Sequence, residues 1–281
     1  KAIRNLNPVD KPKWGYLEPI YDKSYAFPDT FDIPYKPIGA RFMPVDDDSP
    51  LKAVCVFTHP EKNWQNRYFQ GTDPIFTESG HSKMSSAIWD SESQTVAACM
   101  NFRVDDYRFC YLQAMLLGLY YDDYQTRNLV ESNVGSGYMD YTEGRGYWKT
   151  IVPNRMVANH LQTPTGGKMG IRKSGATAKY ILHKLQEMLE VYADNIFIED
   201  LFIQLKTYVR KTTSGGKETF KLENTRHYYD DVIDAVTYAY ICAESYAHLT
   251  PMNKNETQNK KTSYRYGYDS NFNLVLKRRT I

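Results

Sequence analysis

Three acidic side chains that lie far apart in the sequence are of the type that binds divalent cations. Asp73 lies inside an apolar segment, Glu131 ends another, and Asp231 opens a helical pattern. Hydrolysis of a phosphodiester by two metal ions needs carboxylates that hold two hard cations ~3.5–4 Å apart. A bare carboxylate inside a sheet is costly unless a cation compensates for its charge. A metal would therefore explain Asp73.

Two of these acids also have an ordinary structural interpretation. The string Gly71-Thr72-Asp73-Pro74 has the composition of a turn. Glu131, which is followed closely by Asn133 and Gly135, fits a surface residue at the end of a strand. Local sequence favours a catalytic role for Asp73, whereas for Glu131 it favours the surface residue.

The Asp230-Asp231 pair differs from other Asp-Asp pairs by its surroundings. The same dipeptide occurs at positions 46–47, 105–106 and 122–123. Two aspartates at a helix start often cap it, and we expect that role for Asp105-Asp106. Near Asp230-Asp231, however, His227 precedes the pair and Asp234 follows one helical turn later. Acids so close repel one another unless a cation binds.

The elements that must position these acids form a mixed α/β pattern. Apolar alternation and turn residues predict strands at Arg67–Ile75, Ser85–Ser91, Thr95–Phe102 and Arg127–Ser132. Helical spacing predicts helices at 105–120, 174–193, 198–208 and 230–245. Tyr208–Leu222 is predicted to be a β-hairpin. Three hairpin-linked strands, a helix and a fourth strand predict a ribonuclease H-like mixed sheet flanked by helices, with the hairpin added.

The two ends of the chain differ from this central domain, predicted at 61–250. Residues 1–60 are rich in proline and aromatic residues and predict an extended arm or linker. Residues 251–281 form a basic tail, because the chain from Asn253 onward contains seven Lys or Arg residues and only two acidic residues. The tail fits either contact with a phosphate backbone or a solvated terminus.

Several classes of function lack their sequence signals. No G-x-x-x-x-G-K-[ST] string occurs, so ATP hydrolysis is not expected. No apolar run approaches the ~20 residues of a membrane span. The sequence begins at Lys1 without a signal-peptide pattern, and we expect a cytoplasmic piece of a longer protein. The four cysteines form no C-x-x-C pair and are expected to be buried free thiols.

Four strings resemble, in their order, the nuclease domain of the large terminase subunit of tailed phages: Tyr68–Ile75, Leu129–Gly135, Met169–Thr177 and His227–Ala239. The resemblance implies that Asp73, Glu131 and Asp231 coordinate two Mg²⁺ or Mn²⁺ ions, with Asp230 assisting. Asp234 and His227 are additional candidates. The loop Phe76–Lys83 departs from the family, which usually carries a Gly/Asp-rich loop there.

The same resemblance implies an endonuclease that cuts double-stranded viral DNA during genome packaging, in the cytoplasm of the infected host. Its implied partners are the terminase ATPase domain, the portal and the small terminase subunit. Basic residues near the acids are expected to follow the DNA backbone without reading sequence: Arg172, Lys173, Lys179, Arg210, Lys211, Lys217 and Lys221. Two alternatives stay open: another ribonuclease H-like nuclease, such as a resolvase or transposase, and a non-catalytic DNA-binding or motor-docking module.

Overall fold

The fold is taken from a computed structural model of the chain. It describes residues 12–62, 64–75, 82–122, 126–133, 136–147, 150–152, 169–212, 218–222, 230–247, 249, 252–253, 262–268 and 274–280. In the part of the chain that the structure describes, none of the helices has the length and hydrophobicity that a membrane span requires.

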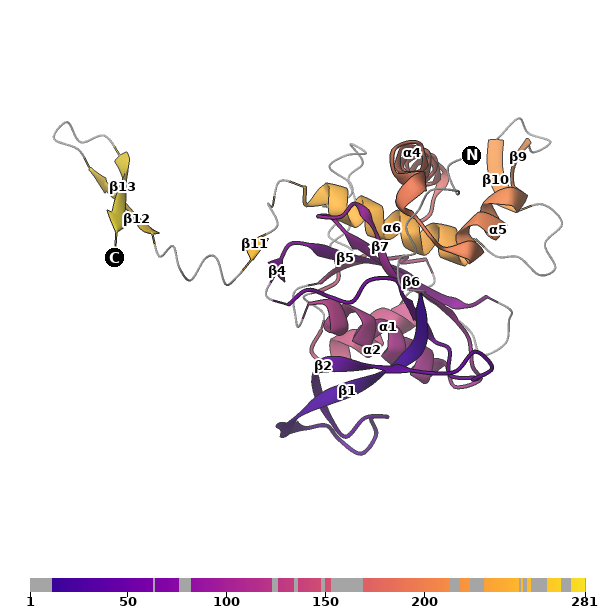
Figure 1. The fold of residues 1–281 in the computed structure, drawn as a ribbon, viewed down its shortest axis with the longest axis horizontal. Coiled ribbons are helices and arrows are strands. Elements are labelled where there is room, and N and C mark those ends of the chain that lie inside the picture. Colours follow the sequence, from indigo (N-terminus) through magenta and orange to yellow (C-terminus); the bar gives the residue numbers. More distant parts are fainter. Residues whose placement is uncertain are drawn as a thin grey trace.

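A seven-stranded sheet in the order β2-β1-β3-β7-β6-β5-β8 forms the centre of the molecule (Figure 1). Its strands are β1 (Lys13–Ala26), β2 (Tyr35–Pro44), β3 (Val54–Val56), β5 (Tyr68–Asp73), β6 (Met84–Asp90), β7 (Thr95–Phe102) and β8 (Arg127–Val130). Neighbouring strands are antiparallel except β5 and β8, which are parallel. The meander β5-β6-β7, the helix α1 (Tyr107–Tyr121) and the returning strand β8 have the predicted ribonuclease H-like layout.

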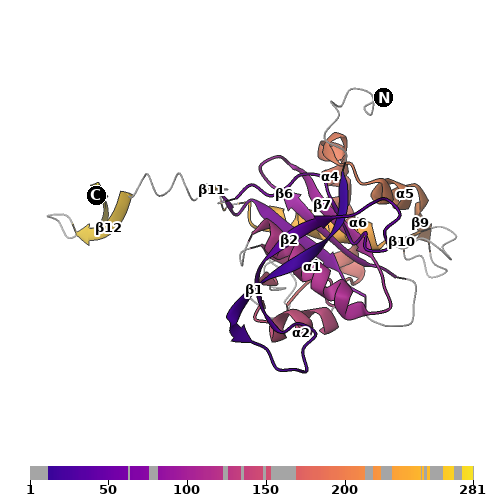
Figure 2. The ribbon, with the colours of Figure 1, turned by 60° about the horizontal axis from the view of Figure 1, so that its bottom comes forward.

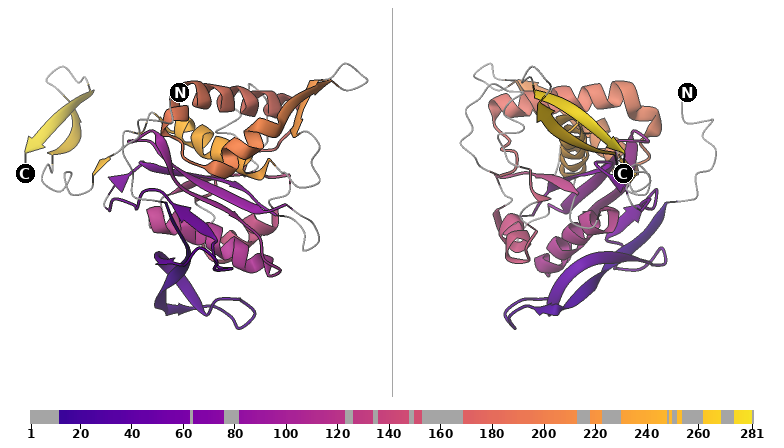
Figure 3. Two further views of the ribbon diagram at one scale, coloured as in Figure 1. Left: turned by 45° about the vertical axis from the view of Figure 1, so that its right-hand side comes forward. Right: turned by 90° about the vertical axis from the view of Figure 1, so that its left-hand side faces the viewer.

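Helices cover both faces of this sheet, as Figures 1 and 3 show. One face carries α6 (Asp231–Ser245), α4 (Gly175–Tyr192), the 3-10 turn η3 (Ala193–Asn195) and α5 (Glu199–Thr207); the other carries α1 and α2 (Ser136–Gly144). Successive strand residues point to opposite faces. On β5, Phe69 therefore belongs to the core under α6, whereas Tyr68 belongs to the core against α1. Both faces are buried, which explains why β6 is buried along its whole length.

The helices follow the predicted pattern, with one addition. Asp106 caps α1, because its carboxylate accepts a hydrogen bond of 3.0 Å from the backbone N–H of Arg108. The sequence did not predict α2, a short polar helix that buries Tyr138 and Tyr141. The cysteines are free and buried, as expected: Cys55, Cys99, Cys110 and Cys242.

The segment expected to be an N-terminal arm contributes strands to the sheet as far as it is described. β1 and β2 form a long antiparallel hairpin (Figure 2), and the start of β1 also pairs with β3. Leu17 of β1 is buried, and the Gln113 side chain of α1 accepts from its N–H (2.7 Å) and donates to its carbonyl (2.9 Å). Pro37 and Pro44 lie in β2, an edge strand of the sheet, where a missing backbone donor is tolerated. The prolines are compatible with an edge strand, although the sequence predicted an arm here.

Three short strand pairs complete the described chain. β9 (Tyr208–Thr212) and β10 (Glu218–Leu222) form the predicted hairpin. β11 (Met252–Asn253) pairs with β4 (Trp64–Gln65). In the basic tail, β12 (Thr262–Tyr268) pairs with β13 (Leu274–Thr280), apart from the sheet in Figures 1 and 2.

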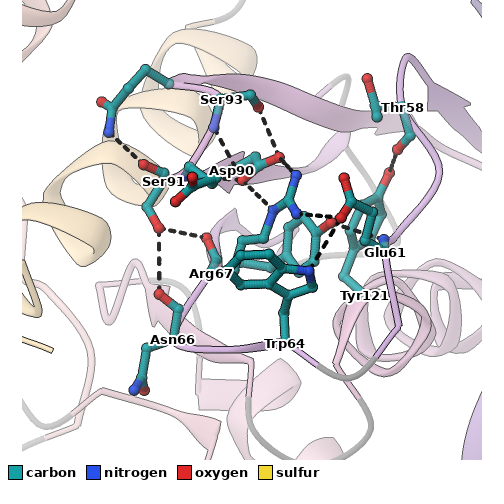
Figure 4. Close-up of polar contacts among 12 residues, drawn as sticks. Thr58, Glu61, Trp64, Asn66, Arg67, Asp90, Ser91, Ser93 and Tyr121 are labelled. Carbon is teal, nitrogen blue, oxygen red and sulfur yellow. Dashed lines mark hydrogen bonds and ion pairs between the residues drawn. The ribbon is translucent and has the colours of Figure 1, made fainter. Parts of the chain in front are cut away.

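A buried ion pair fixes β5 against β6 at the end of these strands that lies away from Asp73 (Figure 4). The Arg67 guanidinium donates to both carboxylate oxygens of Asp90, at 2.8 and 2.9 Å, and also contacts Glu61 at 2.9 Å. A two-pronged contact of this kind sets geometry as well as charge. The register that it supports places Asp73 opposite Ser85 at the other end.

Candidate metal centre

Two carboxylates meet at the ends of two parallel strands. Asp73 is the last residue of β5, and Glu131 directly follows β8. The backbone N–H of Glu131 donates to the carbonyl of Thr72 at 3.0 Å, which continues the β5–β8 pairing by one residue. Both acids therefore lie at the carboxyl ends of neighbouring parallel strands, where open α/β sheets commonly bind ligands.

A third carboxylate comes from α6, and Gly71 allows it to approach. A Cβ atom on Gly71 would lie 2.1 Å from the backbone nitrogen of Ala239 and 2.2 Å from the carbonyl oxygen of Ala235. The backbone of α6 thus packs directly on β5, which carries Asp234 to the strand ends. One carboxylate oxygen from each of Asp73, Glu131 and Asp234 lies within 4.8 Å of the others.

The Asp234 carboxylate is incompletely paired within the described chain. The residue is 2% exposed, and its Oδ1 atom is buried without a hydrogen-bond partner. Such an acceptor costs about 1–3 kcal/mol when left unpaired. Carboxylate oxygens are the ligands that Mg²⁺ and other hard cations prefer. The donor set and the unpaired oxygen both fit a divalent cation.

Asp230 and Asp231 lie beside this group at the start of α6. The Asp231 carboxylate is buried and accepts a hydrogen bond of 2.8 Å from the backbone N–H of Lys83. Asp230 occupies the N-cap position and forms an ion pair with Lys173 at 3.0 Å. The sequence placed Asp231 first among the helix acids, but the structure brings Asp234 within common reach of the two strand acids. A ligand role for Asp231 stays a prediction.

Burial and mutual repulsion raise the carboxyl pKa values of the cluster. Desolvation, followed by the charges of Asp234, Glu131 and Asp231, raises the pKa of Asp73 well above its usual value. Desolvation likewise raises the pKa of Glu131, and it raises that of Asp231 to about 6 and that of Asp234 to about 8. Burial and like charges therefore favour the protonated forms of these acids, and a bound cation would favour the ionised forms.

Lys173 enters the cluster through a short extension of the sheet. Gly170, with φ +75°, precedes Ile171, whose N–H donates to the Val130 carbonyl at 2.7 Å. Two residues later, the Lys173 ammonium contacts Asp230 and Asp234. Burial alone would lower the pKa of Lys173, but these carboxylates raise it above its usual range. The lysine expected to bind DNA is therefore paired within the acidic site.

The other predicted basic residues are less fully described. Arg172 and Lys179 are exposed. The backbones of Arg210, Lys211 and Lys221 lie in the β9–β10 hairpin, whereas Lys217 and the candidate His227 lie outside the described residues. Their roles at DNA stay predictions.

Sequence reasoning missed one side chain in the site. The Tyr238 hydroxyl donates a hydrogen bond of 2.9 Å to Glu131 Oε2. Tyr238 follows Asp234 by four residues and shares its helical face, which was the available signal. Gly71 carried another signal, since an isolated glycine in a strand often marks close approach of a second backbone.

Comparisons with known proteins give structural similarity only. No family model matches the chain, and no curated protein matches its sequence. A crystal structure of the large terminase nuclease from thermophilic phage G20c has a TM-score of 0.48 and 11% identity, covering 67% of this chain and 87% of that chain. The large terminase nuclease domain of Thermus phage P74-26 has a TM-score of 0.47 and 11% identity, over 68% of this chain and 86% of that chain. The G20c nuclease with bound magnesium has a TM-score of 0.46 and 12% identity, over 68% of this chain and 87% of that chain. At 11–12% identity these structures are similar to this chain in fold.

Proposed function

We propose that this chain is a divalent-metal-dependent endonuclease that hydrolyses the DNA backbone. The observation that carries the proposal is the convergence of Asp73, Glu131 and Asp234, whose ligand atoms lie within 4.8 Å of one another. The unpaired oxygen of Asp234 supports it, because a buried acceptor without a donor is costly unless a cation binds.

The proposed cofactor is Mg²⁺ or Mn²⁺, as two ions. When bound, such ions make water nucleophilic and neutralise the charge that develops on the phosphate. The protein's own residues hold the ligands in place. The Tyr238 hydroxyl orients Glu131, and the backbone N–H of Lys83 orients Asp231 beside Asp230. Ligands that are fixed in this way lose little entropy when a cation binds.

The proposed substrate is double-stranded DNA. Arg172, which directly precedes Lys173, and Lys179 on α4 are exposed, and the basic hairpin Tyr208–Leu222 follows in the sequence. Contacts from such residues to phosphates position a duplex without reading its bases. The four sequence strings support the finer proposal that the substrate is viral DNA during packaging in an infected host cell. The proposed partners are a terminase ATPase domain, the portal and the small subunit.

Cleavage of supercoiled plasmid tests this function. With Mn²⁺ or Mg²⁺ we expect nicked and linear products, and Asp73→Asn should reduce the rate at least about 100-fold, because losing even an outer-shell partner typically costs 10–100-fold. Asp140→Asn is the matched control, since Asp140 is exposed on α2 at the opposite face of the sheet. Full cleavage in EDTA, or by the Asp73→Asn protein, would overturn the proposal. Duplex binding without calorimetric Mn²⁺ binding would favour a non-catalytic module.

A further inference from the structure

Lys173 is the cation that the acidic cluster already contains. Its ammonium lies 3.0 Å from Asp230 Oδ2 and also contacts Asp234 Oδ2, and its side chain is 27% exposed. A lysine that served only to follow a DNA backbone would gain nothing from being paired with two acids of the catalytic group. The pairing therefore needs its own explanation.

Asp234 divides the cluster into two cation positions. Its Oδ2 atom contacts Lys173, whereas its Oδ1 atom is buried without a partner. The same carboxylate shares ligand reach with Asp73 and Glu131. One position is thus bounded by Asp73, Glu131 and Asp234, and the second, between Asp230 and Asp234, holds the Lys173 ammonium.

Hydrogen bonds fix the backbone at Lys173 and at the residue that follows it, whereas the Lys173 side chain can change its partners by rotating about its own bonds. The Asn133 side chain donates to the Lys173 carbonyl at 2.9 Å. The next residue, Ser174, begins α4 with a capping box in which its N–H donates to Thr177 Oγ1 at 2.6 Å. A lysine side chain has several rotatable bonds and three donors, so it can exchange one anionic partner for another.

We propose that the Lys173 ammonium occupies the second cation position, so that the DNA-free chain takes one divalent ion and a second enters only when Lys173 leaves. An ammonium and a divalent ion in contact with the same two carboxylates repel each other, so they exclude one another from this position. A phosphate of bound DNA is the anionic partner that accepts the displaced lysine. Lys173 is then a positioning residue that links full metal loading to the presence of DNA. This inference rests on the proposed nuclease function.

Calorimetric Mn²⁺ titration without DNA tests the inference. Wild type should bind one ion, and Lys173→Met should bind two, with the first bound at least about tenfold more tightly because a neighbouring like charge is gone. Lys206→Met is the matched control, because Lys206 is exposed on α5, and it should behave as wild type. Lys173→Arg keeps the charge and should retain one ion. Equal stoichiometry and affinity in wild type and Lys173→Met would overturn the inference, whereas no Mn²⁺ binding by wild type would overturn the proposed function itself.

A second measurement needs no variant. An amine-reactive reagent read by peptide mass spectrometry should modify Lys173 slowly in EDTA and in the one-ion state. Addition of a short DNA duplex with Mn²⁺ on ice should change its rate at least severalfold, whereas Lys206 should keep its rate. Fast labelling of Lys173 in EDTA, or the same labelling rate of Lys173 with and without DNA and Mn²⁺, would overturn the inference.

Discussion

Asp234 combines three properties that make it the key acid of the helix. It is almost fully buried, it shares ligand reach with the two strand acids, and one of its oxygens has no partner in the described chain. Asp231, in contrast, already accepts a backbone hydrogen bond from Lys83. We therefore expect Asp234 to contribute more to the affinity for a cation than Asp231 does.

Substitution of each aspartate by asparagine separates these roles. We expect Asp234→Asn to weaken Mn²⁺ binding at least about 100-fold, more than the 10–100-fold typical of residues outside the ligand shell. Asp231→Asn should lose less Mn²⁺ affinity, because the new amide oxygen can still accept the hydrogen bond from the backbone N–H of Lys83. Titration calorimetry on both proteins measures the difference, with far-ultraviolet circular dichroism as the check on folding. The reverse order of the two losses would show that Asp231 is the principal helix ligand.

The local sequence could suggest these acids but could not choose among them. Asp73 was found because it is a carboxylate inside an apolar strand, and Glu131 was found through the resemblance to the terminase nuclease domain. Which of the three helix acids meets them depends on how α6 is rotated on the sheet, and tertiary contacts set that rotation. The pairing of Lys173 with acids 57 and 61 residues further along is equally invisible in local patterns.

At the scale of elements, the contact between α6 and β5 decides the geometry of the site. Ala235 and Ala239 present small side chains where their helix crosses Gly71, so backbone meets backbone. Any Cβ at position 71 would force the helix away from the strand. The acids of α6 would move with it.

Gly71→Ala should therefore destabilise the protein and weaken metal binding together. Overpacking typically costs about 1–3 kcal/mol and more where backbone atoms cannot give way; we expect at least the upper end of that range. Gly144→Ala is the control, because its Cβ would meet only the Phe31 ring at 3.7 Å. That change should be neutral or stabilising by up to about 1 kcal/mol. Urea unfolding measures both, and a Gly71→Ala protein as stable as wild type would contradict the close packing.

The elements that could be predicted are those whose signals are local. The meander, α1, β8 and the β9–β10 hairpin carry strand or helix periodicity within a few residues of turn formers. The strands β1 and β2 were expected as an arm, because their burial depends on α1 and on β3, which their own prolines and tyrosines do not indicate. Helix α2 is short and polar, and tertiary contacts of Tyr138 and Tyr141 support it.

At the scale of the whole molecule, the fold holds several acids where water is scarce. Helices on both faces of the sheet bury Glu131, Asp231 and Asp234 to 7% exposure or less. Folding therefore works against the ionised forms of these groups, and one lysine offsets only part of their charge. The free energy of unfolding therefore depends on whether protons or metal ions neutralise the remaining negative charge of these acids.

This dependence predicts opposite pH trends with and without metal. The pKa of Asp231 is raised to about 6 and that of Asp234 to about 8 in the folded protein, from about 3.9 in an unfolded chain. The folded state thus binds protons that the unfolded state has released, so in EDTA the free energy of unfolding should fall as pH rises from about 4 to about 8. Saturating Mn²⁺ should reverse the trend, because it binds the deprotonated ligands of the folded state.

Thermal unfolding between about pH 4 and about pH 8 measures both trends. Asp234→Asn should flatten the slope in EDTA, whereas the control Asp140→Asn should leave the slope unchanged. The prediction would be contradicted if the melting temperature in EDTA rose with pH to the same extent in wild type and Asp234→Asn. Folding would then not raise the pKa values of the buried acids.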